Sequence, residues 1–244
     1  MLKISAPVII PYLVLLINKS LREGVFPSSW KLALLNPLLK TLSPISPCDT
    51  RPIALLSEVS KILERAVFAQ LYEFVESNNL MVSYQSCYKK GHGTQTALLG
   101  VLEETRRAME DRKMTIIVLF DFTNAFDCIP HKFLLQKLRK MGLSDVPIKW
   151  LALYLFLRKQ SVRDEHGRPT GFRPVASGVP QGSILGPLLF ALFISDLPRV
   201  LRHAVCTRLC RKYADDTQIY HHFAITEINE AIARVQADAQ AVVD

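Results

Sequence analysis

Apolar residues recur at helical spacing in several parts of the chain. Between Leu56 and Leu71 they return every three or four residues, and Ser57 stands where a helix N-cap belongs. The same spacing predicts further helices over 94–112, 131–141, 145–158 and 226–243. Two segments, residues 1–20 and 183–197, are apolar on nearly every face, which is typical of buried helices.

Elsewhere the apolar pattern changes to that of β-strands. Met114–Phe120 is a short, continuous apolar run rich in β-branched residues, which predicts a buried strand. We expect a hairpin that pairs 162–164 with 172–175, and a strand–turn–strand unit within 205–220. Thr41–Thr50, with two prolines, is linker-like. Because strands and helices do not alternate regularly, the pattern favours an α+β fold over a doubly wound sheet.

Composition narrows the class of protein. The 244 residues are 49% apolar and 21% charged, so the chain can bury a sizeable core and is not disordered. Its net charge of +8 suits a polyanionic partner. The five cysteines form no CxxC pair, so we expect an intracellular protein of the cytoplasm or nucleus. The apolar start, interrupted by Pro7 and Pro11, is too short to span a bilayer, so we expect no membrane partner.

Three acidic residues occupy positions that suit a metal site. Asp121 directly follows the predicted strand, and Asp215 and Asp216 stand together at a predicted turn. Carboxylates brought close together repel one another unless a cation joins them, and Mg²⁺ prefers such oxygen ligands. Two Mg²⁺ ions can clamp the attacking and leaving oxygens of a phosphoryl transfer. The alternative is that Asp121 caps a helix and that Asp215 and Asp216 form a solvated turn.

A glycine- and proline-rich loop, Ser177–Ser183, opens directly into an apolar helix. A helix N-terminus offers unpaired N–H groups to an anion, and Gly182 lets a ligand approach the backbone closely. Gln181 would point its side chain out of the loop. The alternative is an ordinary loop in which Ser183 is the N-cap.

Together these motifs resemble those of a known family. Asp-x-x-x-Ala-Phe-Asp at 121–127, Ser-Gly-Val-Pro-Gln-Gly-Ser-Ile-Leu-Gly-Pro at 177–187 and Tyr-Ala-Asp-Asp at 213–216 occur in the order of a reverse transcriptase. From about Trp30 to Tyr220 the chain resembles the polymerase domain of non-LTR (LINE-like) retrotransposons. Arg-Pro-Ile at 51–53 and Lys-Ile-Leu-Glu at 61–64 support the resemblance.

The resemblance implies roles for individual residues. Asp121, Asp215 and Asp216 would be catalytic and would hold two Mg²⁺ ions, with Mn²⁺ as a substitute. The backbone carbonyl of Phe122 would complete the metal site. The residues implied to bind the nucleotide are Arg51, Lys89, Phe126 (a steric gate under the sugar), Gln181 and Gly182, and those implied to bind nucleic acid are Lys90 and Tyr213.

The sequence departs from the family pattern in a few places. Tyr88 and Lys89 replace a usual Phe-Arg pair, which keeps the charge and loses the bidentate fork. Asn124 replaces a usual Lys in the first acidic motif. Arg211 and Lys212 stand before Tyr213, where apolar residues are expected.

The resemblance also implies an architecture, a right-hand polymerase fold of the α+β class. We expect helical fingers and a truncated palm with a small antiparallel sheet, and no thumb. Residues 1–113 would form the N-terminal and fingers region, and 114–244 the palm, with fingers elements within about 132–176. The chain would be a fragment of a longer polyprotein whose thumb and endonuclease regions are missing.

The leading hypothesis is an RNA-directed DNA polymerase domain, a nucleotidyltransferase that adds dNTPs to a DNA primer on an RNA template during retrotransposition. An alternative is a non-catalytic remnant that at most binds nucleic acid. A haloacid-dehalogenase-like phosphatase also places an Asp after an apolar strand. That class needs a second acid two residues later, where this chain has Thr123.

Overall fold

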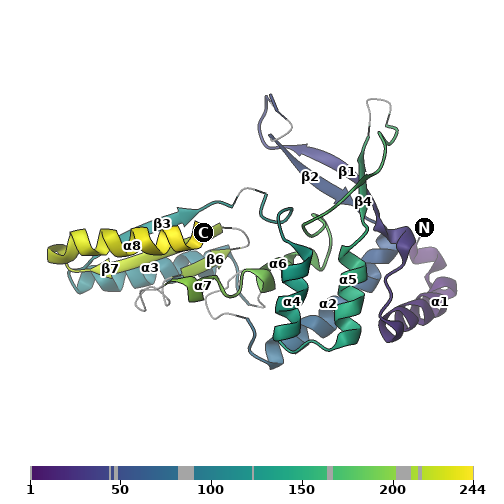
Figure 1. Cartoon of the computed structure of the whole chain (residues 1–244), viewed down its shortest axis with the longest axis horizontal. Helices are drawn as coiled ribbons and strands as arrows, with labels where there is room; N and C mark the ends of the chain where they lie inside the picture. Colours follow the sequence, from purple (N-terminus) through teal and green to yellow (C-terminus); the bar gives the residue numbers. More distant parts are fainter. Residues whose placement is uncertain are drawn as a thin grey trace. The chain divides into compact units, whose positions relative to one another are not determined.

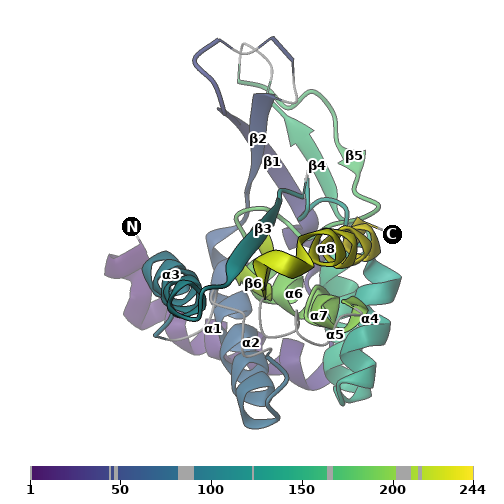
Figure 2. The same ribbon diagram turned by 90° about the vertical axis from the view of Figure 1, so that its left-hand side faces the viewer.

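The computed structural model describes residues 2–43, 45–46, 49–81, 91–122, 124–163, 167–201, 210–213 and 216–243. For residues 2–5, 200, 210–213 and 216 only the backbone is described. The chain forms two compact units, one of residues 1–74 and 126–189 and the other of residues 75–125 and 190–244. Figure 1 labels most of the helices and strands of both units, and β5 is labelled in Figure 2. The functional division expected near residue 113 stays a prediction.

The first unit combines four helices with a four-stranded sheet in the order β2-β1-β4-β5. Strand β1 pairs antiparallel with β2 and parallel with β4, and β4 pairs antiparallel with β5. The four strands run side by side in Figure 2, beyond one end of the helices α2, α4 and α5. The elements are α1 (Leu2–Glu23), β1 (Leu32–Leu39), β2 (Thr50–Leu55), α2 (Glu58–Ser77), α4 (His131–Lys140), α5 (Asp145–Leu155), β4 (Lys159–Val162) and β5 (Arg173–Pro174), followed by the start of α6 (Gly186–Phe193).

Aromatic side chains form much of the core of this unit. Phe26 packs edge-on against Trp150 and Tyr154, which are buried on α5. The Trp150 indole N–H donates to the Ser20 hydroxyl at 3.0 Å, so α1 is tied to α5 by a buried hydrogen bond. The Arg158 guanidinium lies over the Tyr154 ring, 5.2 Å from its centre. This core fixes the base from which β4 begins.

The second unit is a three-stranded antiparallel sheet in the order β3-β7-β6. Helix α8 covers one face, where Ile219 of β7 packs with Ala239 and Val242. Helix α3 covers the other, where Tyr220 packs on Val101. Consecutive residues of a strand point to opposite faces of the sheet, which is why Ile219 packs against α8 and Tyr220 packs against α3. The elements are α3 (Thr94–Glu110), β3 (Met114–Phe120), α7 (Leu197–Val200), β6 (Cys210–Tyr213), β7 (Asp216–Phe223) and α8 (Ile228–Val243).

Most of the predicted elements are confirmed. The helices beginning at residues 94, 131 and 145 start as predicted, and Gly142 follows α4 with a left-handed φ of 98°. The predicted hairpin is formed by β4 and β5, but its first strand begins at Lys159, earlier than predicted. The preceding helix, α5, correspondingly ends at Leu155 rather than at residue 158. The helix expected over 183–197 is shorter and occurs as α6.

Some predictions about strands and burial were wrong. The linker-like segment 41–50 does connect two elements, but these are strands β1 and β2, which were not predicted because Pro37 interrupts the first. Helix α1 forms over both of its prolines but is not buried, since Tyr12 is 71% exposed. Strand β3 is an edge strand, and Leu119 on it is 72% exposed. Among the described helices, none combines the length and apolar character needed to cross a membrane.

Candidate active site

The antiparallel pairing of β3 with β7 brings two of the predicted catalytic positions together. Phe120, the last residue of β3, is opposite Thr217 in the register. The paired register ends there: Asp121 directly follows Phe120 on one side, and Asp216 directly precedes Thr217 on the other. The two acidic positions are therefore each one residue beyond the same pair of strand residues. Asp215 lies outside the described residues, as does the side chain of Asp216.

The chemistry of this strand end suits a divalent cation. The Asp121 side chain is exposed, and its carboxylate offers hard oxygen ligands of the kind that Mg²⁺ binds. The Phe122 ring stacks on the Phe120 ring with centroids 6.3 Å apart, which holds the backbone at the strand end. Within the described part of the chain, no three His, Cys, Asp or Glu side chains form a metal-binding group, and that part excludes Asp215. Asp121 therefore supplies one carboxylate of the kind that the expected ion prefers, and the other two expected ligand side chains lie outside the described residues.

In the first unit, the loop 177–182 is held against the segment 126–131 by backbone hydrogen bonds. Val179 N–H donates to the Phe126 carbonyl at 2.8 Å, and the Ser177 hydroxyl donates to the Asp127 carbonyl at 2.8 Å. Gly178 has a φ of 85°, and a Cβ there would lie 2.6 Å from the Asp127 Cα. Only glycine tolerates this combination of backbone angle and close approach. The two motifs, about fifty residues apart, therefore form one rigid substructure.

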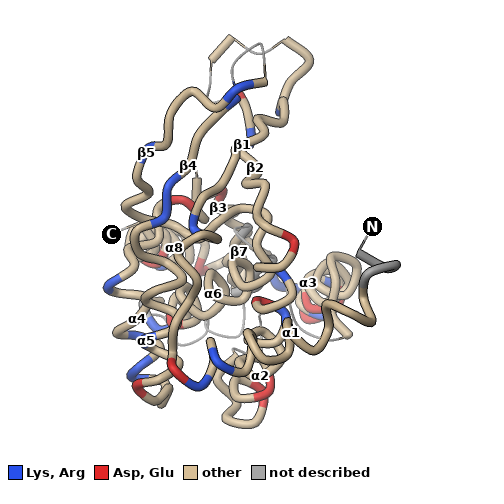
Figure 3. Tube along the Cα trace, turned by 90° about the vertical axis from the view of Figure 1, so that its right-hand side faces the viewer, with Lys and Arg blue, Asp and Glu red and all other residues tan. Residues whose placement is uncertain are grey.

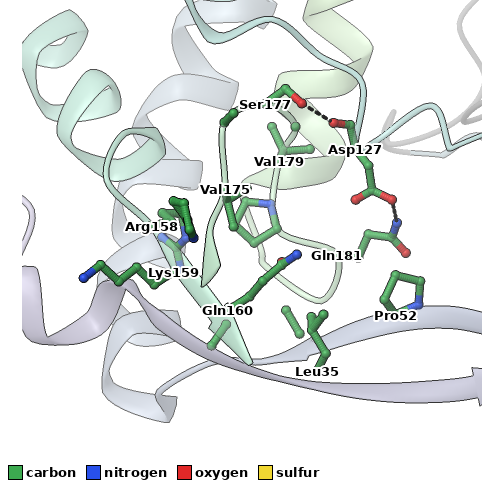
Figure 4. A pocket seen from close by; sticks show the side chains of 16 residues that line it. Leu35, Pro52, Asp127, Arg158, Lys159, Gln160, Val175, Ser177, Val179 and Gln181 are labelled. Carbon is green, nitrogen blue, oxygen red and sulfur yellow. Dashed lines mark hydrogen bonds between the residues drawn. The ribbon is translucent and has the colours of Figure 1, made fainter. Parts of the chain in front are cut away.

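The Gln181 side chain lies in a cavity of about 370 Å³ between this loop and the sheet. Its amide donates to the Asp127 carboxylate at 2.7 Å (Figure 4). Burial raises the pKa of Asp127 above its ordinary value, and the hydrogen bond from Gln181 partly opposes that shift. The Lys159 and Gln160 side chains of β4 also line the cavity. Polar groups from three segments thus converge on one hollow.

Strand β2 supports the same loop from the other side. The Ala54 N–H donates to the Gln181 carbonyl at 2.8 Å. Gly182 has a φ of 101°, and a Cβ there would lie 2.9 Å from the Ala54 carbonyl oxygen. A side chain at Gly182 would therefore clash with the strand as well as strain the backbone.

The N–H groups at the start of α6 are already paired with the protein's own oxygens, so the expectation that they are open to a ligand anion is wrong. Glu64 Oε2 accepts from the N–H of Ile184 at 2.9 Å and of Leu185 at 3.4 Å. The Ser183 hydroxyl accepts from the N–H of Gly186 at 2.9 Å, which makes Ser183 a cap, the alternative interpretation of the sequence. The anion at this helix end is the carboxylate of Glu64.

His131 fastens the base of the loop. Its ring Nε2 lies 2.7 Å from the Gly178 carbonyl oxygen and must carry the proton to donate there. Burial lowers the pKa of His131, and the nearby Arg158 lowers it further, while the contact with the Gly178 carbonyl opposes both. The neutral ring is therefore the form that the folded chain favours.

The other residues implied to bind ligands lie on different elements of the chain or outside the described residues. Arg51 lies exposed on β2, opposite Leu38 of β1. Phe126 is half-buried in the turn that follows Ala125. Tyr213 is the last residue of β6, opposite Asp216, and only its backbone is described. Lys89 and Lys90 lie outside the described residues. The roles implied for all of these residues stay predictions.

Sequence reasoning assigned no role to Glu64, Asp127 or His131. Glu64 offered a signal, because it falls on the same helical face as Leu63, Val67 and Leu71, where an acid is unexpected. Asp127 belonged to a recognised motif, but its partner Gln181 is 54 positions away. His131 gave no signal, because its acceptor is a backbone carbonyl.

Solved structures with a similar fold include two telomerases at low sequence identity. One, an apo telomerase from Candida tropicalis truncated from the C-terminal domain, has a TM-score of 0.55 at 14% identity, with 88% of this chain and 47% of that chain covered. Telomerase from Candida albicans, in complex with a fragment of telomeric RNA, has a TM-score of 0.53 at 12% identity, over 86% of this chain and 40% of that one. The fold of the chain is thus similar to part of the fold of these telomerases.

The chain belongs to the reverse transcriptase (RNA-dependent DNA polymerase) family, whose profile matches residues 43–242. It is 32% identical to the RNA-directed DNA polymerase from mobile element jockey of Drosophila melanogaster, over 85% of this chain. It is also 32% identical, over 86% of its length, to the probable polymerase from transposon BS of the same species. The chain spans 23% of each of these relatives. The resemblance to polymerases of non-LTR retrotransposons is therefore confirmed, and the phosphatase alternative was wrong.

Proposed function

We propose that this chain is the nucleotide-adding part of a retrotransposon RNA-directed DNA polymerase. The primer 3′-hydroxyl attacks the α-phosphate of a dNTP, a new P–O bond forms, pyrophosphate leaves and the hydroxyl proton passes to water. The observation that carries the proposal is the register of β3 and β7, whose last pair, Phe120 and Thr217, is followed by Asp121 and preceded by Asp216 in a member of the reverse transcriptase family.

Asp121, Asp215, Asp216 and the Phe122 carbonyl would hold two Mg²⁺ ions, with Mn²⁺ as a substitute. Bound ions of this kind neutralise triphosphate charge and stabilise the attacking and leaving oxygens. The contribution of the chain is to fix the carboxylates in advance. Asp121 is held at the end of a strand and Asp216 at the start of its neighbour, so little reorganisation is needed.

The cavity beside Gln181 would receive the nucleotide and the template base. Gln181 lines this cavity and Gly182 follows it in the same loop, and Phe126 would exclude a ribose 2′-hydroxyl. Arg51, through its guanidinium fork, and Lys89, as a point charge, would meet the triphosphate. Support for this assignment comes from the rigid attachment of the loop to Phe126 and Asp127.

An RNA template paired with a DNA primer would be the macromolecular partner, with Lys90 and Tyr213 among its contacts. Lys and Arg residues lie along β4 and β5, where they are drawn blue in Figure 3. Such residues bind phosphates without reading sequence. The relatives are about four times longer, so further regions, including a thumb and an endonuclease, would complete the working protein.

Primer extension on a homopolymer RNA template with dTTP and Mg²⁺ tests the proposal. We expect extension by the wild-type chain and its loss by orders of magnitude in Asp121→Asn, because an amide cannot supply the charge that holds the ions. Asp145→Asn, at an exposed acid on α5, is the matched control. A wild-type chain that binds template–primer but adds no nucleotide would instead support the non-catalytic alternative.

A further inference from the structure

Glu64 is a fully buried carboxylate in the middle of α2. Besides the N–H groups of Ile184 and Leu185, it accepts hydrogen bonds from the Ser60 hydroxyl at 3.2 Å and the Tyr154 hydroxyl at 3.3 Å. Each of the four donors comes from the protein, so the charge is compensated without water. Tyr154 stays neutral there, because burial and the nearby Glu64 both raise its pKa.

These contacts join segments that are remote in sequence. Glu64 lies 120 positions from Ile184 and 90 from Tyr154. Its two backbone contacts are made at the end of the turn 180–185, the same turn that carries Gln181 and Gly182. The other end of the turn is held by Ala54 through its hydrogen bond to the Gln181 carbonyl. The turn is therefore clamped on both sides of Gly182.

We propose that Glu64 is a positioning residue that sets the place of Gln181 and Gly182 for the incoming nucleotide. The inference rests on the proposed function, since it assumes that these two residues meet the nucleotide. Glu64 does not reach the cavity itself; it acts through the backbone of residues 184 and 185. By accepting from the N–H groups of Ile184 and Leu185, it fixes the backbone at the start of α6 and, with it, the end of the turn.

The geometry requires a carboxylate of this length at position 64. A glutamine would keep one acceptor oxygen, but its NH₂ group would compete with the donors that surround it. An aspartate would keep the charge and shorten the reach by one methylene, so its oxygens would no longer meet Ile184 and Leu185. Both changes preserve polarity and approximate size, and both should release the turn.

Hydrogen–deuterium exchange of the full chain tests the clamp without relying on activity. We expect the amides of Ile184 and Leu185 to exchange about tenfold or more faster in Glu64→Gln and in Glu64→Asp than in the wild type. Glu73→Gln, an identical change at an exposed position of the same helix, should leave them unchanged. Circular dichroism identifies the folded variants, and unchanged exchange in either folded variant would overturn the proposal.

Steady-state primer extension then tests the consequence for the nucleotide. We expect the KM for dNTP to rise about tenfold in the Glu64 variants while kcat changes much less. A merely structural role would reduce the fraction of active enzyme, and so kcat, at unchanged KM. An unchanged KM in a variant with accelerated exchange also overturns the positioning role. A wild-type chain that extends no primer would contradict the proposed function, and the exchange measurement would still decide the clamp.

Discussion

Gln181 and Asp127 are joined by a hydrogen bond of 2.7 Å between a side-chain amide and a carboxylate, 54 positions apart in the sequence. The bond is made at the edge of the cavity, and it fixes the direction of the Gln181 side chain. Because Asp127 is half-buried, its negative charge is costly in the folded state, and its raised pKa reflects that cost. The pair thus combines a favourable contact with an unfavourable charge.

Replacing Asp127 separates these two effects. Asp127→Asn keeps an acceptor for Gln181 and removes the charge, so we expect its free energy of unfolding at pH 7 to equal or exceed that of the wild type. Because the pKa of Asp127 is raised in the folded state, ionisation of Asp127 lowers the free energy of unfolding as the pH rises above about 3.8. The difference in unfolding free energy between Asp127→Asn and the wild type should therefore shrink near pH 4. Asp127→Ala removes the acceptor and should lose about 1 kcal/mol. Urea unfolding measures the stability of the wild type and of the two variants. Equal stability of the Ala and Asn variants would contradict a stabilising role of the hydrogen bond between Gln181 and Asp127.

Phe126→Val tests the choice of sugar. The turn around Phe126 is fixed by Val179, so the smaller side chain should open space without moving the backbone. We expect dNTP incorporation to persist and rNTP incorporation to rise by about tenfold or more, since the ring excludes by size. Single-nucleotide extension with each substrate measures the ratio, and Phe133→Val, at an exposed position on α4, is the control. An unchanged ratio would mean that the gate lies elsewhere.

The stability of the chain should depend on His131 between pH 7.5 and 5.5. Its folded-state pKa is lowered, so the unfolded chain takes up a proton near pH 6.5 that the folded chain resists. The free energy of unfolding should therefore fall as the pH drops below about 6.5. His131→Gln can still donate to Gly178 but cannot titrate, so its loss of stability over this range should be smaller. Burial also lowers the pKa of His222. Because both the wild type and His131→Gln contain His222, its titration affects the two proteins equally.

Binding of template–primer should depend on the cations of β4 and β5. Lys159 and Arg173 are exposed on these paired strands. Neutralising both, as Lys159→Gln with Arg173→Gln, should weaken binding to an RNA–DNA duplex and reduce the slope of log K against log salt by about 1 to 2. Arg106→Gln is a suitable control, because Arg106 pairs with Glu103 on α3. Fluorescence anisotropy over a salt series measures the slope; equal slopes would exclude this hairpin as a phosphate contact.

Local sequence patterns were sufficient for the elements whose stability is local. The helix beginning at Thr94, the strand Met114–Phe120 and the Gly142 cap were all predicted from periodicity and backbone preference, and all are present. Strands β1 and β2 were not predicted. Their stability comes from pairing with each other and with β4, more than a hundred residues away, and no local period encodes such a partner.

The motifs of the candidate site could be recognised in the sequence, but the tertiary structure determines which of their residues contact one another. The order of the motifs indicated a reverse transcriptase, because the chemistry requires those residue types. That Asp121 and Asp216 each lie one residue beyond the same strand pair depends on the register of β3 with β7. That Glu64 takes the N–H groups expected to be free at the start of α6 depends on the packing of α2. A buried charge is stable only where donors converge on it, and donors from α2, α5 and the 184–185 backbone converge only when the chain is folded.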